Sequence, residues 1–107
     1  MDLKPETIVS NILSDIAEVN DWASIADATG ANDINSFHAT PDEVFTILTA
    51  VKNSPDLALG TVTNEFKDFP DSWSPRDITD RIFASSDPIF SMMDIFMRPT
   101  KEWPTEE

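Results

Sequence analysis

The chain has 107 residues, of which 40% are hydrophobic and 25% charged, and its formal net charge is −13. The length and these proportions are typical of one folded domain with a modest core. The absence of cysteine excludes disulfides, thiolate metal sites and cysteine nucleophiles. The acidity disfavours direct binding to nucleic acid or to an anionic membrane, because phosphate contacts need Lys and Arg.

Three features of the sequence bear on its location. Residues 1–10 lack the positively charged and apolar regions of a secretory signal peptide. No apolar run reaches the roughly 18–20 residues that a membrane-spanning helix needs. The absence of cysteine is also typical of a reducing compartment. We therefore expect a soluble, cytoplasmic protein.

Repeated helix-start signals indicate the fold class. A Ser, Thr or Asp stands directly before a proline at Thr40–Pro41, Ser54–Pro55, Ser74–Pro75 and Asp87–Pro88. Proline is tolerated at the first helical position, and the preceding side chain can cap the first turn. We expect an all-α fold, namely a single-domain compact orthogonal bundle of about five or six short helices. This acidic domain is expected over residues 1–99, with a frayed tail at 100–107.

The N-terminal half is expected to contain four helical segments. The first covers 5–19, where the apolar positions fall on one helical stripe: Ile8, Ile12, Ile16 and Val19. A short helix is expected at 21–28, before Gly30, and a shorter helical piece at 33–38. The next helix is expected at 41–52, where Thr40 and Glu43 have the spacing of a capping box.

Segment 55–69 is ambiguous. Its apolar residues have helical spacing: Leu59, Val62, Phe66 and Phe69. Gly60, however, costs about 1 kcal/mol relative to alanine inside a helix. We expect a helix here, with a minor strand near 57–66 as the alternative.

Two helices are expected at the C-terminal end, at 75–85 and 88–98. The second is apolar around about two-thirds of its circumference, which is typical of a buried central helix. The alternative is that it forms a docking or dimer interface, since methionines suit adaptable surfaces. That apolar interface would consist of Phe90, Met93, Phe96 and Met97. Pro99 ends the helix, and Trp103 in the tail is a residue that could fold back onto the body.

The sequence contains no recognisable catalytic or metal-binding pattern. The Asp- and Asn-rich run 27–43 does not fit the EF-hand register, which requires glycine at its sixth position. Starting at Asp27 places Asn32 there, and starting at Asp33 places His38 there. His38 is the only histidine, tyrosine is absent, and there is no glycine-rich phosphate loop. We expect no enzymatic activity, no catalytic residues, no cofactor and no metal.

The charge distribution gives the leading hypothesis for function. Residues 5–51 contain eight acidic residues and no Lys or Arg. We interpret them as an anionic, DNA-mimic-like face for a partner protein with a basic surface, formed by Asp15, Glu18, Asp21, Asp27, Asp33, Asp42 and Glu43. The protein would then inhibit a nucleic-acid-binding protein, by analogy of kind with phage and mobile-element inhibitors used against host defence.

Two alternatives to this hypothesis stay open. The acidity can be that of ordinary solvated helix faces, or an adaptation to high salt. Alternatively, the protein is a helical adaptor or a self-associating module, and a dimer would then form through helix 88–98. The sequence does not fix the oligomeric state.

Overall fold

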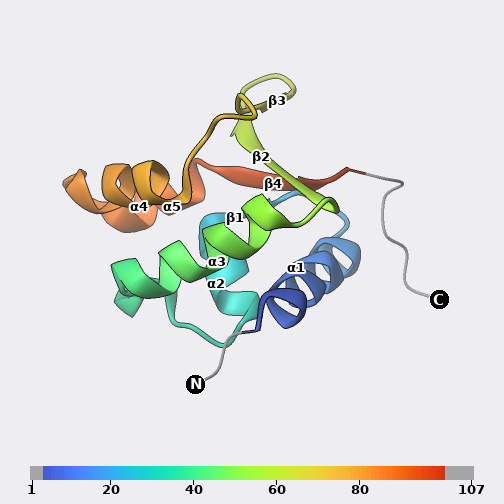
Figure 1. The fold of residues 1–107 in the computed structure, drawn as a ribbon, viewed down its shortest axis with the longest axis horizontal. Helices are drawn as coiled ribbons and strands as arrows, with labels where there is room; N and C mark the ends of the chain where they lie inside the picture. Colours follow the sequence, from blue (N-terminus) through green and yellow to red (C-terminus); the bar gives the residue numbers. More distant parts are fainter. Residues whose placement is uncertain (1–3, 101–107) are drawn as a thin grey trace.

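The computed structural model describes residues 4–100, which form five α-helices, a short 3₁₀ helix and a four-stranded antiparallel sheet (Figure 1). The expected all-α bundle is therefore wrong, because the described chain mixes helices with a sheet. In chain order the elements are α1 (Pro5–Val19), β1 (Ala23–Ser24), α2 (Ile25–Ala31), η1 (Ser36–His38), α3 (Pro41–Asn53), β2 (Leu57–Val62), β3 (Phe66–Asp68), α4 (Pro75–Ala84), α5 (Pro88–Met93) and β4 (Phe96–Pro99).

Capping interactions begin three of the helices. Thr40 Oγ1 accepts from the Glu43 backbone at 3.2 Å, and Glu43 Oε1 accepts from the Thr40 backbone at 2.9 Å, so the capping box of α3 is confirmed. Ser74 Oγ accepts a bond in the first turn of α4. Helix α2 begins at Ile25, later than expected, because Ser24 and Asp27 form its capping box.

The helix expected at 55–69 is wrong, because this segment forms the hairpin β2–β3. Ser54–Pro55 does not begin a helix. Instead, Ser54 Oγ accepts a hydrogen bond from the Asp56 backbone at 3.1 Å, which closes a turn after α3. The chain then extends into β2, in agreement with the alternative strand near 57–66.

The helix expected at 88–98 is also wrong, because α5 ends at Met93 and β4 begins at Phe96. From Ile95 to Pro99 the residues alternate between buried and half-buried, which is the period of a strand. Strand β4 lies in the interior of the sheet, whose order is β1-β4-β2-β3. Met97 pairs with Ala23 on one side and with Leu59 on the other.

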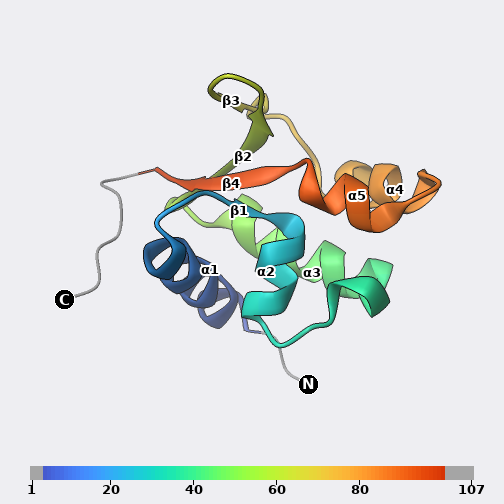
Figure 2. The same ribbon diagram turned by 180° about the vertical axis from the view of Figure 1, so that it is seen from behind.

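The helices cover the sheet unevenly. Helices α1, α2 and α3 lie on one side of it, whereas α4 and α5 pack at the end of the molecule away from α1 (Figures 1 and 2). The largest fully buried side chains come from the helices and from the sheet, and they form one core: Ile8, Ile12, Ile16, Ile25, Val44, Ile47, Leu48, Val51, Leu59, Ile82, Met92 and Met97. Within residues 4–100, no helix has the length and apolar character needed to cross a membrane.

The C-terminal end of the described chain is attached to the β2 side. Thr100 donates from its backbone to the Asp56 carbonyl at 3.0 Å and from its hydroxyl to the Pro55 carbonyl at 2.6 Å. The remainder of the expected tail lies outside the described residues, and so does the expectation for Trp103.

Candidate interaction surfaces

Three of the predicted acidic residues come together where α1 packs against α2. The two helices are joined by a hydrogen bond of 2.9 Å from Asn11 Nδ2 to Asn32 Oδ1. Partial burial raises the pKa of Asp15 above its ordinary value, and the negative charges of Asp27 and Glu18 raise it further. Asp15, Glu18 and Asp27 therefore form one anionic group, which we call the α1–α2 cluster.

The other four predicted acidic residues occupy separate positions. Asp21 follows α1, and its carboxylate accepts a bond of 2.8 Å from the Trp22 backbone. Asp33 follows α2 and has a positive φ of 62°. Asp42 and Glu43 lie in the first turn of α3, where negative charge interacts favourably with the helix dipole. Some of the N-terminal acidity thus stabilises local structure.

Three described cations make defined contacts: Arg98 with Asp68, Lys52 with Trp73, and Arg76 with Phe45 of α3, 4.3 Å from the ring centre. Arg98 makes two hydrogen bonds to the Asp68 carboxylate, at 2.7 and 2.8 Å, which hold the pKa of Asp68 below its ordinary value. Lys52 lies 4.9 Å from the Trp73 ring centre. Arg98–Asp68 is the one ion pair found within residues 4–100, so no Lys or Arg of that range pairs with the α1–α2 cluster.

The raised pKa of Asp15 leads to a prediction about stability. We expect Asp15→Asn to increase the free energy of unfolding at pH 7 and low salt, by less than a core substitution would change it. A raised folded-state pKa means that the folded state penalises the charged carboxylate, so wild-type stability falls as pH rises above the unfolded value of about 3.9. Urea unfolding should show a higher free energy of unfolding for Asp15→Asn than for wild type at pH 7, and no difference between the two at pH 3. A variant less stable than wild type at pH 7 would contradict the prediction.

The four residues of the predicted apolar interface do not share one surface. Met97 is fully buried in β4, and Phe96 is half-buried in the same strand. Phe90 and Met93 lie on α5 with 63% and 49% of their surface exposed. A helix through 98 would have placed all four on a common arc, but the change to a strand after Met93 separates them.

An exposed aromatic residue that was not singled out in the sequence adds to the α5 surface. Phe37 in η1 is 79% exposed and lines a depression of about 260 Å³ together with Ile89 of α5. We call Phe37, Ile89, Phe90 and Met93 the η1–α5 patch. Exposed apolar groups of this kind are typical of protein-binding surfaces. In the sequence, this surface could have been recognised from a large aromatic residue within the otherwise polar run 35–38.

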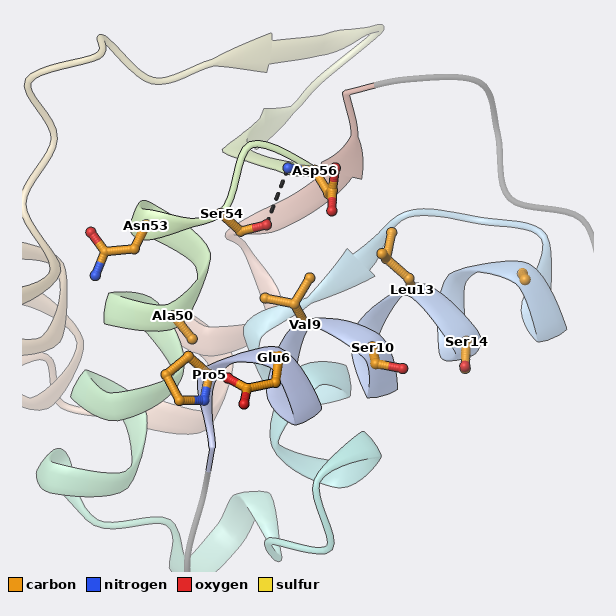
Figure 3. A pocket seen from close by; sticks show the side chains of 11 residues that line it. Pro5, Glu6, Val9, Ser10, Leu13, Ser14, Ala50, Asn53, Ser54 and Asp56 are labelled. Carbon is orange, nitrogen blue, oxygen red and sulfur yellow. Dashed lines mark hydrogen bonds between the residues drawn. The ribbon is translucent and has the colours of Figure 1, made fainter.

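A groove between α1 and the end of α3 was also missed. It has a volume of about 500 Å³ (Figure 3), and we call it the α1–α3 groove. Its lining consists of Pro5, Glu6, Val9, Ser10, Leu13, Ser14, Ala17, Ala50, Asn53, Ser54 and Asp56. In the sequence, the groove could have been recognised from a second apolar row on α1 beside the core stripe, in which Val9, Leu13 and Ala17 recur at helical spacing.

Residues 4–100 contain no group of three His, Asp or Glu side chains arranged to hold a metal ion. Comparison of the chain with protein-family models, with curated proteins and with solved structures gives no match. Function is therefore inferred from the three surfaces described above.

Proposed function

We propose that this protein acts by protein–protein contact, as an acidic antagonist of a nucleic-acid-binding protein. The α1–α2 cluster would occupy a basic groove of that partner. The observation that carries the proposal is that Glu18 and Asp27 lie close enough to Asp15 to repel its charge, within a segment that has no Lys or Arg from 5 to 51. Carboxylates on such a face compete for the Lys and Arg side chains that otherwise contact phosphate.

The supporting structure holds this charge in place. The Asn11–Asn32 hydrogen bond connects the two helices, and the Ser24–Asp27 capping box fixes the start of α2. A pre-arranged charged face loses little conformational freedom on binding. The net charge of −13 would also speed the encounter with a basic partner. We place the protein in the cytoplasm, and its proposed role is that of an inhibitor of phage or mobile-element type, without enzymatic activity.

A charge-neutralising triple variant tests the proposal. Asp15→Asn, Glu18→Gln and Asp27→Asn together should weaken capture of a basic partner from lysate by roughly tenfold, equivalent to about 1.4 kcal/mol. The amide introduced by Asp27→Asn retains an oxygen that can accept the capping bond of α2. Added duplex DNA should displace the captured partner, and binding should weaken as salt screens the charges. Quantitative pull-down across a salt series measures all three effects.

The matched control neutralises three exposed carboxylates elsewhere, through Glu65→Gln, Asp71→Asn and Asp80→Asn. Each triple variant removes three negative charges, so both have a formal net charge of −13 + 3 = −10. Equal loss of binding in the two variants would show a non-specific charge effect and would contradict the proposed face. Binding that duplex DNA does not displace would contradict the proposed antagonism.

The η1–α5 patch supports a second candidate function, that of an adaptor or self-associating module. The specific observation is that Phe37 is exposed and lines the depression beside α5, and that Phe90 and Met93 are exposed on α5 itself. Binding through this patch would bury apolar surface and would be nearly independent of salt. The Met93 variant considered in the Discussion separates this candidate from the first.

A further inference from the structure

The α1–α3 groove has an apolar floor. Val9 and Ala50 are buried beneath it, and Leu13 is half-buried at its side (Figure 3). Ser10 and Ser14 are small and exposed, so they leave the space above the floor open. A volume of about 500 Å³ is within the range of clefts that hold a few side chains or a small ligand.

The charged groups that line the groove are acidic. Glu6 and Asp56 lie at opposite ends of the labelled set, with Val9 between them (Figure 3). The backbone of Asp56 is fixed by its bonds to Ser54 Oγ and to Thr100. Within residues 4–100, no Lys or Arg lines the groove. The apolar floor and the Glu6 carboxylate together fit an apolar side chain with a neighbouring cation.

The groove lies opposite Asp15 of the α1–α2 cluster across α1, whereas Glu18 of the cluster lies one turn from Ser14 of the groove lining. Leu13 lines the groove and Asp15 belongs to the cluster, and residues two apart on an α-helix are about 200° apart. A partner that binds across the exposed face of α1 would therefore contact both the groove and the cluster.

We infer that the α1–α3 groove binds a segment of the partner protein in which an apolar side chain has a Lys or Arg next to it. This inference rests on the proposed function and specifies the chemistry of the partner segment. A second copy of the chain fits less well, because it brings another net charge of −13 toward an acidic site. Val9, Leu13 and Ala50 would receive the apolar side chain, and Glu6 would pair with a neighbouring cation.

The test uses the full chain and two peptide probes. One is a 14-residue amphipathic helix made only of Leu and Lys, and the other is an oligolysine of equal charge. In an NMR titration, the Leu–Lys peptide should shift the amide signals of Ser10, Leu13 and Ser14 and bind more tightly than oligolysine. Ser14→Trp should fill the groove and weaken the Leu–Lys peptide roughly tenfold. Thr63→Trp, at an exposed position between β2 and β3 and outside the lining, should leave its affinity unchanged.

Several outcomes would overturn the inference. Peptide shifts confined to Asp15, Glu18 and Asp27, or unchanged binding by folded Ser14→Trp, would show that charge alone holds the probe, and the proposed function would survive. Ser10→Trp provides a second filled groove if Ser14→Trp does not fold. Two further outcomes are measured without peptide. If the amide signals of the groove shift on Trp103→Ala, residues 101–107 occupy the groove. If these signals shift with protein concentration, a second copy of the chain occupies it.

The two proposals can fail separately. If the Asp15→Asn, Glu18→Gln and Asp27→Asn variant retains partner capture while the Leu–Lys peptide still occupies the groove, the anionic-face function fails and the groove remains a binding site. If the variant loses capture and the peptide does not enter the groove, only the further inference fails.

Discussion

Replacing Gly60 by alanine is expected to lower the free energy of unfolding by about 2 kcal/mol or more. A Cβ atom at this position would lie 2.2 Å from the Lys67 carbonyl oxygen and 2.7 Å from Phe66 Cε1. The carbonyl belongs to β3, whose register places Gly60 opposite Asp68, so it cannot retreat without disturbing the hairpin. Urea unfolding at neutral pH measures the loss.

Gly30→Ala is the matched control. An added Cβ there has no heavy atom within 4 Å, and Gly30 lies within α2 with a φ that is not positive. Alanine should therefore stabilise the protein by about 0.5–1 kcal/mol. A helix over 55–69 would make Gly60→Ala stabilising for the same reason. A gain in stability at Gly60 would thus contradict the hairpin and support the helix expected from the sequence.

The predicted helices are correct where local interactions determine them. The starts of α3 and α4 depend on capping atoms three residues apart, and these were visible in the sequence. The boundaries of α1, α3 and α4 agree with the predicted ranges 5–19, 41–52 and 75–85 to within one residue. For these elements, proline, the capping residue and the apolar stripe all favour the same structure.

Strands β1 and β4 could not be predicted because their pairing connects distant residues, whereas the β2–β3 hairpin is local and agrees with the alternative strand near 57–66. Strand β4 pairs with β1 and β2, whose paired residues lie 72–74 and 36–42 positions earlier, and no local pattern encodes that contact. Short apolar runs are compatible with both a strand and a helix when periodicity is the only evidence. Ile95–Pro99 is such a run. Because it directly follows the helical segment that became α5, the sequence favoured one continuous helix over 88–98.

The candidate surfaces were predictable only in part. Composition located the acidity in residues 5–51, but only the packing of α1 on α2 shows that Asp27 lies near Asp15. The α1–α3 groove depends on the same kind of tertiary contact, since Ala50 and Val9 are 41 positions apart. Charge sign is a property of the sequence, whereas the spacing of charges is a property of the fold.

Met97→Asp is expected to unfold the protein, whereas Met93→Asp should change its stability by no more than about 0.5 kcal/mol. Met97 is fully buried in β4, and a carboxylate there would lose its hydration without gaining a partner. Met93 is 49% exposed on α5, so an aspartate can reach water. In the helix expected at 88–98, these positions would lie four residues apart on one face and respond alike. Urea unfolding of both variants tests this, and equal effects would contradict β4.

Because Met93→Asp should remain folded, it also separates the two candidate functions. If the η1–α5 patch mediates association, the variant should lose it, and Phe90→Asp should act in the same way because Phe90 is 63% exposed on the same helix. Sedimentation velocity and partner capture at low and high salt measure this. Binding that resists salt but fails in Met93→Asp identifies the patch as the interface. Binding that weakens with salt and survives Met93→Asp, but fails when Asp15, Glu18 and Asp27 are neutralised, assigns the interaction to the anionic face.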